Sequence, residues 1–499
     1  MIQFFKRKKE PTKKPKNLLF NNKKCVIEEK TKEFVHDLHQ RSLGLMDFDR
    51  LEGSASQQIT LFGSFNSALK SSGQRLFNQG RGLALNTSIG ARYVQFVTDN
   101  VVGNALTPKV MLLKSDGTVD LKLNEEIESN FWRWASSQKR FSVNDRFNFI
   151  ECLQILEKER CQGGEAFLIM HDEETLQFSI RTAEECDWSY NKRVDDNTVI
   201  YQGIEYNETT MKPIAYWFRK RDLLTQSFTN THVRYEASKV RHYFFPKSAD
   251  ALRGVTDFLP VIKDISHLDA WRETTIVQKR IASSSMGFIE TDKNESQFEL
   301  DDDNYYNKQV VADFSPGSIQ ELAPGQRIKQ ISSTQTGDDF SKFHDSMMNS
   351  IAMGLSCFQQ ALTGDTSNIN YSSARFGDLQ QRSRFKAIQD RLIDVVIMPM
   401  FEAWLRHCVM HSTLSIKMSQ VSKIIENTTV IRPKYSSVDP IKDVQADIAM
   451  IEAGLKSRSS TIIERGEDPV KVFLEIANEK RELNKVISSS DETDPDNNQ

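Results

Sequence analysis

The chain has no long apolar run and few cysteines, and both shortages narrow the classes of protein to which it can belong. No stretch of its 499 residues approaches the roughly 20 uninterrupted apolar residues of a membrane-spanning helix. Its start, MIQFFKRKKEPTKKPK, lacks the apolar segment that follows the positive charges of a secretory signal. The six cysteines show no CxxC spacing, which favours reduced, buried thiols over a disulfide framework or a zinc site. We therefore expect a protein made in a cytoplasm, with no membrane partner.

The chain also lacks an excess of charge of one sign. Charged residues make up 27% of the sequence, yet the formal net charge is only -3. Proteins that hold nucleic acid by counterion release need basic faces, so the composition excludes a tight electrostatic grip on DNA by the whole molecule. The Lys-rich segment 1–40 favours a flexible, solvated basic tail over a nucleic-acid contact, and segment 488–499 is typical of a disordered acidic tail.

Motifs for catalysis and ligand binding are missing as well. The sequence has no GxxxxGK[ST] phosphate loop and no HExxH. The run LDDDNYYN lacks the glycine and the closing glutamate of a calcium loop, and CQGGEAFLIM lacks the GxGxxG of a dinucleotide site. His36 and His39 have no third ligand nearby and indicate a solvated pair. We predict neither a cofactor nor a metal site.

One polar loop, LTGDTSNINYSSAR at 362–375, is the best candidate for chemistry. Ser372 or Ser373 would be the nucleophile of a serine-dependent hydrolase, and Asp365 is the only other residue of catalytic type before Arg375. Neither serine lies in a GxSxG elbow, and no His and Asp signature marks the rest of a triad. A structural loop is therefore favoured, and the hydrolase remains an alternative.

The spacing of apolar residues predicts a mixed organisation. Residues 120–160 show helical spacing, and the section that follows alternates as strands do. Two amphipathic helices, over 258–283 and 337–356, enclose a mixed segment and suggest a hairpin with a small subdomain at its tip. The long helical stretch after the loop contains Pro399, where we expect a kink.

The C-terminal region gives the clearest local signals. The stretches VDPIKDVQADIAMIEAG and EDPVKVFLEIANEK each open with Asp and then Pro, an N-cap acceptor followed by the ring that suits the first helical position. Gly454 and Gly466 stand where C-terminal caps are expected. These patterns predict a short helical module.

The loop and its surroundings resemble a known family. The stretch GLSCFQQALTGDTSNINYSSAR is similar to the signature of the lambda-type portal proteins of tailed bacteriophages, in which TGD and then NYSSAR lie between two helices. Further similar stretches follow in the family's order: NVVGNALTP, FWRWASSQKRF, GGEAFL, RGVTDFLPVIKDISHLDAW, IMPMFEAWL and SVDPIKDVQADIAMIEAGLKSRSSTIIERGEDPVKVFLEIANEK. Together they span roughly residues 75–480, and the combination is specific although single pieces are not.

The resemblance implies a mixed α+β, helix-dominated portal fold, in which an elongated subunit assembles into a ring, typically of twelve. The implied parts are a wing (41–257), a first stem helix (258–283), a clip (284–336), a second stem helix (337–356), a tunnel loop (357–374), a kinked wing helix with a following strand (375–435) and a crown (436–487). The near-neutral charge agrees with a channel that must not grip DNA.

The resemblance also implies a function and partners. The protein would be a non-enzymatic conduit for double-stranded DNA at a capsid vertex of the virion, assembled in the host bacterial cytoplasm. Its partners would be further copies of itself, the terminase large subunit, the major capsid or scaffolding protein and a head-completion adaptor. A different head–tail connector ring is the second alternative, although such adaptors are usually shorter and lack a clip.

Particular residues are implied for each surface. The tunnel-loop candidates at the DNA channel are Thr363, Gly364, Asp365, Asn368, Asn370, Tyr371 and Ser372. The stem candidates that would face the channel are Lys263, Lys279, Arg280 and Lys342. The clip candidates that would face terminase are Asp301, Asp302 and Asp303.

Overall fold

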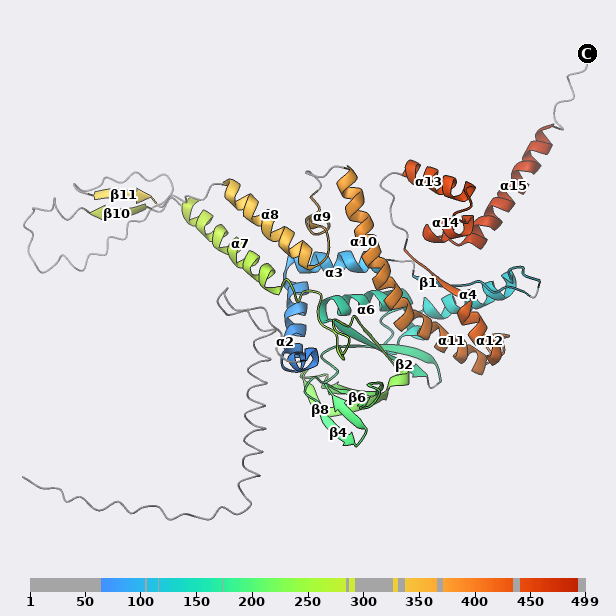
Figure 1. Cartoon of the computed structure of the whole chain (residues 1–499), viewed down its shortest axis with the longest axis horizontal. Helices are drawn as coiled ribbons and strands as arrows, with labels where there is room; N and C mark the ends of the chain where they lie inside the picture. Colours follow the sequence, from blue (N-terminus) through green and yellow to red (C-terminus); the bar gives the residue numbers. More distant parts are fainter. Residues whose placement is uncertain are drawn as a thin grey trace, which may run out of the picture. The chain divides into compact units, whose positions relative to one another are not determined.

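The computed structural model describes most of the chain beyond its N-terminal segment. The described residues are 64–103, 106–114, 116–172, 174–283, 287–291, 326–330, 337–365, 371–433 and 440–491. The chain divides into two compact units, Met1–Gly73 and Gln74–Gln499, with the boundary inside helix α2 (Phe65–Asn86). The elements discussed below belong to the second unit and are drawn in Figure 1. Within the described residues, no helix has the length and apolar character needed to cross a membrane.

The region 120–160 is helical, but as three helices with breaks between them. These are α4 (Leu121–Ala135), α5 (Gln138–Phe141) and α6 (Phe149–Gly163). Asn148 begins α6 with a capping box, in which its side chain accepts from the backbone of Glu151 and the Glu151 carboxylate accepts from the backbone of Asn148. These two hydrogen bonds satisfy backbone N–H groups that have no partner within the first helical turn, so a new helix begins at this position.

The section after α6 is β-rich, as the sequence predicts. A three-stranded sheet has the order β3 (Leu176–Thr182), β2 (Glu165–Asp172), β9 (Val240–Phe244). A five-stranded antiparallel sheet follows the chain order: β4 (Lys192–Asp195), β5 (Thr198–Tyr201), β6 (Ile204–Asn207), β7 (Pro213–Arg221), β8 (Phe228–Glu236). Phe167 of β2 contacts Tyr216 and Phe218 of β7, so a shared core joins the two sheets.

A cluster of aromatic rings forms a second core between α4, α5, α6, β3 and α11 (Met398–Met410). Its members are Phe131, Trp134, Phe141, Phe149, Phe178, Phe401 and Trp404. Most of the pairs meet edge-on or tilted, the arrangement that ring quadrupoles favour. The helical segment FWRWASSQKRF is therefore an element of the core.

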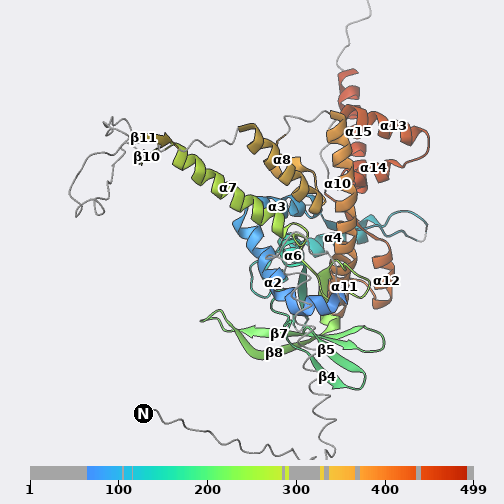
Figure 2. The same ribbon diagram turned by 60° about the vertical axis from the view of Figure 1, so that its left-hand side comes forward.

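Two long helices lie side by side, as Figures 1 and 2 both show for α7 (Ile262–Ser283) and α8 (Gly337–Gly354). We call this pair the hairpin. Trp271 stacks on Phe340 with the ring centroids 4.5 Å apart. Between the helices, β10 (Gly287–Thr291) pairs antiparallel with β11 (Gln326–Gln330). Helix α7 begins later than the predicted residue 258, because a hydrogen-bonded turn from Phe258 to Val261 precedes it.

The predicted loop 357–374 contains more helix than its composition suggests. Helix α9 (Gln359–Thr363) lies inside it, and α10 (Tyr371–Leu392) already begins within it. A π-helical segment, Ile393–Ile397, joins α10 to α11 and ends just before Pro399. Proline cannot donate a backbone hydrogen bond, and a π segment is one way in which a helix accommodates such a gap. The kink at Pro399 stays a prediction.

The C-terminal region is helical. After α12 (Met418–Glu426), strand β12 (Thr428–Ile431) pairs antiparallel with β1 (Thr107–Val110). Then follow α13 (Pro440–Glu452), α14 (Arg458–Glu464) and α15 (Pro469–Asp491). Gly454 and Gly466 have positive φ of 72° and 77°, the conformation expected of C-terminal caps. Helix α15 runs past residue 487, into the segment predicted to be a disordered tail.

Candidate functional site: the junction at the base of the hairpin

The two ends of the hairpin meet at one place. Asp257 and Phe258 lie just before α7, and Leu355 and Ser356 follow α8. A Cβ atom added to Gly354 would lie 2.4 Å from Cγ1 of Val261, the residue just before α7, so the end of α8 packs tightly against the chain that leads into α7. The base of the hairpin is therefore a fixed geometric unit.

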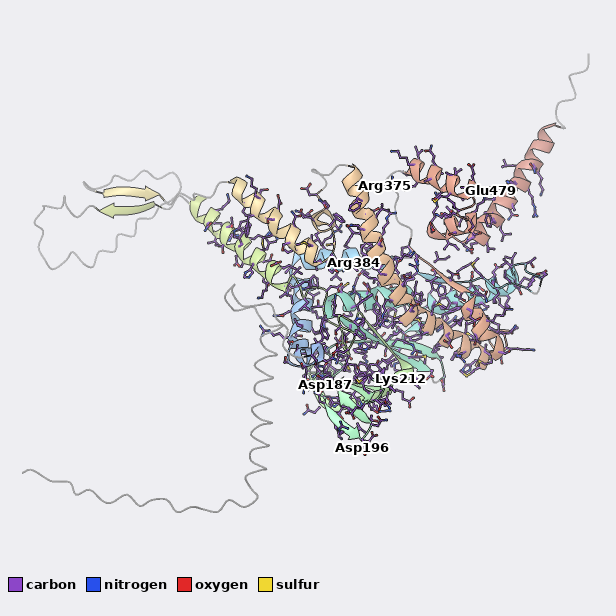
Figure 3. All side chains as sticks on the ribbon, viewed as in Figure 1. Asp187, Asp196, Lys212, Arg375, Arg384 and Glu479 are labelled. Carbon is purple, nitrogen blue, oxygen red and sulfur yellow. The ribbon has the colours of Figure 1, made fainter. Side chains whose placement is uncertain are left out.

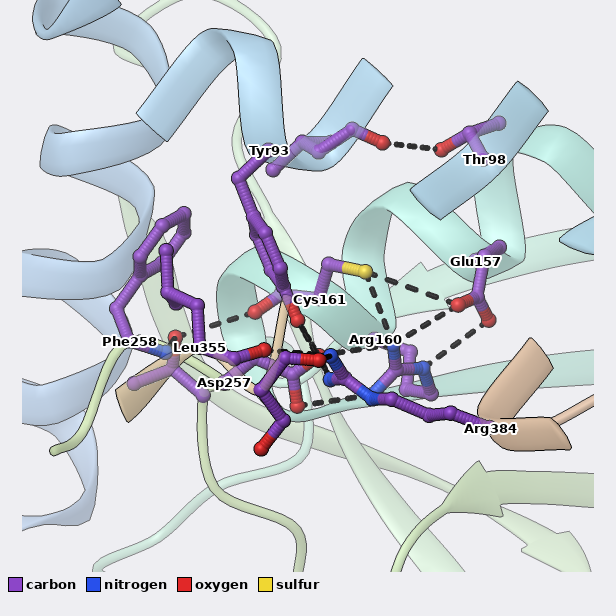
Figure 4. Close-up of polar contacts among 12 residues, drawn as sticks. Tyr93, Thr98, Glu157, Arg160, Cys161, Asp257, Phe258, Leu355 and Arg384 are labelled. Atoms are coloured by element: carbon purple, nitrogen blue, oxygen red, sulfur yellow. Dashed lines mark hydrogen bonds and ion pairs between the residues drawn. The ribbon is translucent and has the colours of Figure 1, made fainter. Parts of the chain in front are cut away.

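Arg384 of α10 binds this base from the side (Figures 3 and 4). Its Nη1 donates to the carbonyl oxygens of Leu355 and Ser356, the latter at 2.9 Å. Its Nη2 donates to the hydroxyl of Tyr93 on α3 (Ser88–Val101) at 2.8 Å. Because carbonyl groups at the end of a helix lack helical partners, a cation placed there both satisfies and neutralises them.

Asp257 is the anion at the centre. The Tyr93 hydroxyl donates to Oδ2 of Asp257 at 3.0 Å, and both terminal nitrogens of Arg160 donate to its carboxylate at 3.0 Å. Arg384 lies 3.9 Å from the same carboxylate. Burial alone would raise the pKa of Asp257, but the charges of Arg160 and Arg384 hold it below its ordinary value. Asp257 is therefore ionised at neutral pH.

Glu157 of α6 completes the cluster, which we call the junction: Tyr93, Glu157, Arg160, Asp257 and Arg384. Arg160 donates to both Glu157 oxygens, at 3.0 and 2.8 Å. Two cations thus balance two anions. Burial raises the pKa of Tyr93 well above its usual value, so its hydroxyl stays a donor. The arrangement joins α3, α6, α10 and the hairpin, and its charges are engaged with one another.

A second buried ion pair lies at the contact of two stretches that carry the family resemblance, GGEAFL and RGVTDFLPVI. Glu165 accepts from Nε of Arg253 at 2.6 Å and from the backbone N–H of Gly254 at 2.8 Å. Gly164 has φ +92°, and a Cβ there would lie 2.3 Å from the backbone of Val255. Gly164 is therefore needed for the close approach of these two stretches, whereas a Cβ on Gly163 would meet the ring of Phe77 at 2.7 Å.

Arg253 and Glu165 are both fully buried. The remaining donors of Arg253 reach main-chain carbonyl oxygens, including that of Ala183 at 3.0 Å, and its guanidinium lies 3.7 Å from the ring centroid of Trp188. Burial would raise the pKa of Glu165, but Arg253 and then the hydrogen bond from His242 lower it to about 2. Patterns in the sequence single out neither cluster, although the stretches that resemble the family contain Glu165, Arg253 and Asp257.

The predicted tunnel-loop residues are only partly described. Thr363, Gly364 and Asp365 are exposed. Gly364 caps α9 with φ +72°, its N–H donates to the Gln360 carbonyl at 2.8 Å, and a Cβ there would meet nothing within 4 Å. A glycine is therefore needed at position 364 for its left-handed backbone conformation, and not to leave room for a neighbouring atom. Two candidates open α10, Tyr371 and Ser372. Two lie outside the described residues, Asn368 and Asn370.

The other predicted site residues are exposed or undescribed. Four stem candidates are exposed on the hairpin: Lys263, Lys279, Arg280 and Lys342. That they face a DNA channel stays a prediction. The clip candidates Asp301, Asp302 and Asp303 lie outside the described residues. Among the residues that the structure describes, no group of three His, Cys, Asp or Glu could hold a metal ion, and the cysteines are free thiols.

Comparison with known proteins bears directly on the family. Residues 55–389 match the family described as phage portal protein, lambda family. The probable portal protein of Halomonas phage phiHAP-1 is 22% identical over 423 residues, 83% of this chain and 81% of the relative. Portal protein B of Escherichia phage lambda is 22% identical over 265 residues, 48% of this chain and 50% of the relative.

Solved structures give weaker likenesses. A chain from the neck of a native gene transfer agent particle has a TM-score of 0.40 and 11% identity, over 80% of this chain and 94% of that one. A chain from the virion of a native gene transfer agent particle has a TM-score of 0.41 and 12% identity, with the same coverage.

Proposed function

The chain belongs to the lambda family of phage portal proteins, and we propose that copies of it form a ring around a channel for double-stranded DNA. As a member of that family it is a structural protein and not an enzyme. This overturns the alternative of a serine-dependent hydrolase. Within the proposal, the ring stands at one vertex of a phage or phage-like capsid and has twelve subunits.

The observation that carries the proposal is the hairpin, which is fixed at its base and exposes apolar side chains along its length. Ile276, Val277 and Phe343 are 51%, 44% and 44% exposed. Exposed apolar side chains that follow an anchored helix pair are expected to be covered by something else. A neighbouring copy, related by rotation, would cover the same face on every subunit and close a ring.

The loop between α9 and α10 supports passage of DNA without tight binding. Its described part, ending at Asp365, contains no cation. Each phosphate that a protein neutralises adds salt-sensitive affinity, and such affinity would act as friction on moving DNA. We propose that copies of this loop line the channel and contact DNA transiently through short polar side chains.

Other proposed contacts follow from the family and the charge pattern. We propose that the segment 284–336, through its acidic run Asp301–Asp303, meets the terminase large subunit, which supplies the force because this sequence has no phosphate loop. The same ring would later bind a head-completion adaptor and, from assembly onward, the capsid or scaffolding protein. We also propose that the helical region 436–487 forms a crown inside the head; its helix α13 is tied to α10 by the ion pair of Arg375 with Asp443 at 3.0 Å.

Ring formation is tested on the purified full chain by native mass spectrometry and negative-stain imaging at micromolar concentration. We expect large rings with a central hole, and a strictly monomeric species would overturn the proposal.

The tunnel-loop assignment is tested by deletion of residues 364–371 in the phage-like particle. We expect rings to assemble while packaging or retention of DNA fails. A matched variant replaces the same residues by a Gly/Ser segment of equal length, which separates the loss of side chains from the change in chain length. Normal packaging and retention by the deletion would refute the assignment.

A further inference from the structure

A pocket lined by residues of α4, α5, β3 and α11, and of the turns beside them, shares no residue with the junction or with the hairpin. Its volume is about 480 Å³, inside the range of roughly 300–1,000 Å³ typical of binding sites. Trp134, Leu176, Trp404 and Cys408 form the apolar part of the lining. The pocket therefore adjoins the aromatic cluster that forms the second core.

The aromatic wall of the pocket is held rigidly. The rings of Trp134 and Trp404 lie 6.3 Å apart, and Nε1 of Trp134 donates to the carbonyl of Leu176 at 3.1 Å. Trp404 is only 2% exposed, because Phe131 and Phe401 pack against it. A rigid apolar wall loses little conformational entropy when a ligand binds.

Three cations gather at the same pocket: Arg133, Lys139 and Arg140 line it and are exposed. None of them forms an ion pair with an Asp or Glu among the residues that the structure describes. Within the described part of the chain, no acidic residue lines the pocket, although the chain has slightly more acidic than basic residues, 68 against 65. One carboxylate that acts on the lining residue His407 is that of Asp172, which is itself paired with Lys239 at 2.7 Å.

We propose that this pocket docks a segment of another protein in which bulky aliphatic side chains stand between carboxylates. The aliphatic side chains would displace water from the half-buried ring of Trp134, and the carboxylates would pair with the three cations, with the arginines able to bind in a bidentate manner. The positive charge of Arg133, Lys139 and Arg140 favours binding of an acidic segment.

Single-stranded nucleic acid is the competing ligand for a basic, aromatic surface, because bases stack on exposed ring faces. Here Trp404 is almost completely covered by its neighbours. With Trp404 covered, a flat base has no second ring face to stack on, whereas a branched aliphatic side chain needs only the space beside Trp134. The geometry favours a peptide.

The test uses the full chain and a fluorescein-labelled peptide of sequence Glu-Glu-Leu-Leu-Asp-Glu, with binding followed by fluorescence anisotropy at low salt. We expect a dissociation constant on the order of micromolar. Peptides with Ser-Ser in place of Leu-Leu, or with lysines in place of every acidic residue, should bind at least about tenfold more weakly. Equal binding of the serine peptide would overturn the apolar half of the proposal.

The site is located with a triple variant, Arg133→Glu, Lys139→Glu and Arg140→Glu, which should lose binding. A matched control, Lys192→Glu, Lys212→Glu and Lys220→Glu, makes the same change in net charge at exposed positions in and beside the five-stranded sheet and should bind as the wild type does. Equal loss in both variants, no binding by the wild type, or preference of the wild-type pocket for an oligothymidylate would each overturn the proposal.

Discussion

Nη2 of Arg384 lies 2.8 Å from the hydroxyl oxygen of Tyr93, and this hydrogen bond joins α10 to α3. The same guanidinium caps the end of α8 through the Leu355 and Ser356 carbonyls. Helix α10 begins at the predicted tunnel loop. A displacement of α10 must therefore break these bonds or move the base of the hairpin with it. The junction therefore ties α10 to both α3 and the base of the hairpin.

Replacing Arg384 by Ala should loosen the base of the hairpin. The change leaves the α8 carbonyls and Asp257 with fewer partners, and removing one member of a buried charged cluster costs about 3 kcal/mol. Hydrogen exchange followed by mass spectrometry should show faster exchange at the end of α8 and the start of α7. The five-stranded sheet should be unaffected.

The matched control for Arg384 is Arg406→Ala. Arg406 pairs with Glu402 one helical turn away, but both side chains are more than 40% exposed. Such surface pairs contribute about 0.5 kcal/mol or less. Equal exchange at the end of α8 in the Arg384 variant and in the control would contradict a role of Arg384 in holding the hairpin.

Two glycines of α2, Gly80 and Gly82, should respond to alanine in opposite directions. A Cβ on Gly80 would lie 2.2 Å from the carbonyl oxygen of Gln162, whereas a Cβ on Gly82 would meet nothing within 4 Å. Gly82→Ala should stabilise the protein by about 0.5–1 kcal/mol through helix propensity. Gly80→Ala should destabilise it, because the backbone at Gln162 or in α2 would have to move to make room for the added Cβ. Thermal melts of the two variants check this, and a shift of the same sign in both would refute the close approach.

The sequence predicts much of the fold because helical and strand spacing are local patterns. The hairpin helices, the β-rich section and the glycine caps at Gly454 and Gly466 all follow from residues that are near neighbours in the chain. The sequence does not predict the start of α10, because the stretch NYSS has no apolar periodicity. Its helical state depends on the chain that follows it.

The junction and the Glu165–Arg253 pair, in contrast, could not be predicted from the sequence. Glu165 and Arg253 are 88 positions apart, and Tyr93 and Arg384 are 291 apart. No spacing rule links such residues, and a single charged residue in a motif has the same appearance whether it is solvated or buried. The resemblance to a family identifies the stretches that hold Glu165, Arg253 and Asp257. Which residues these side chains bind is seen only in the folded structure.

The stability of the protein should fall in acid through Glu165. Its pKa is about 2 in the folded protein, against an ordinary value of 4.5. A depressed carboxyl pKa contributes stability that is fully present above 4.5 and is lost as the pH falls from there toward 2. The shift corresponds to about 3 kcal/mol. Urea unfolding at a series of pH values measures this loss.

The variant Glu165→Gln isolates that contribution. It should be destabilised by about 3–5 kcal/mol at neutral pH, since Arg253 then lies buried without its anion. It should also lose part of the acid dependence between pH 4.5 and 2, because the titrating group is gone. An unchanged slope of stability against pH in the variant would show that Glu165 is not the group responsible.

The apolar face of α7 should be required for ring assembly but not for the fold of the subunit. Ile276 is 51% exposed in the single chain, so Ile276→Asp leaves the monomer's core intact. In a ring, the same change would bury an unpaired carboxylate against a neighbour, which costs several kcal/mol at every interface.

We expect Ile276→Asp to retain the circular dichroism of the wild type and to run as a monomer in native mass spectrometry. The matched control is Thr274→Asp on the same helix. Thr274 is also exposed, and two positions along a helix are about 200° apart around its axis. The control should therefore still form rings if the face carrying Ile276 is the interface. Rings of wild-type size in the Ile276 variant would exclude that face, and loss of rings in both variants would indicate a general effect of charge on α7.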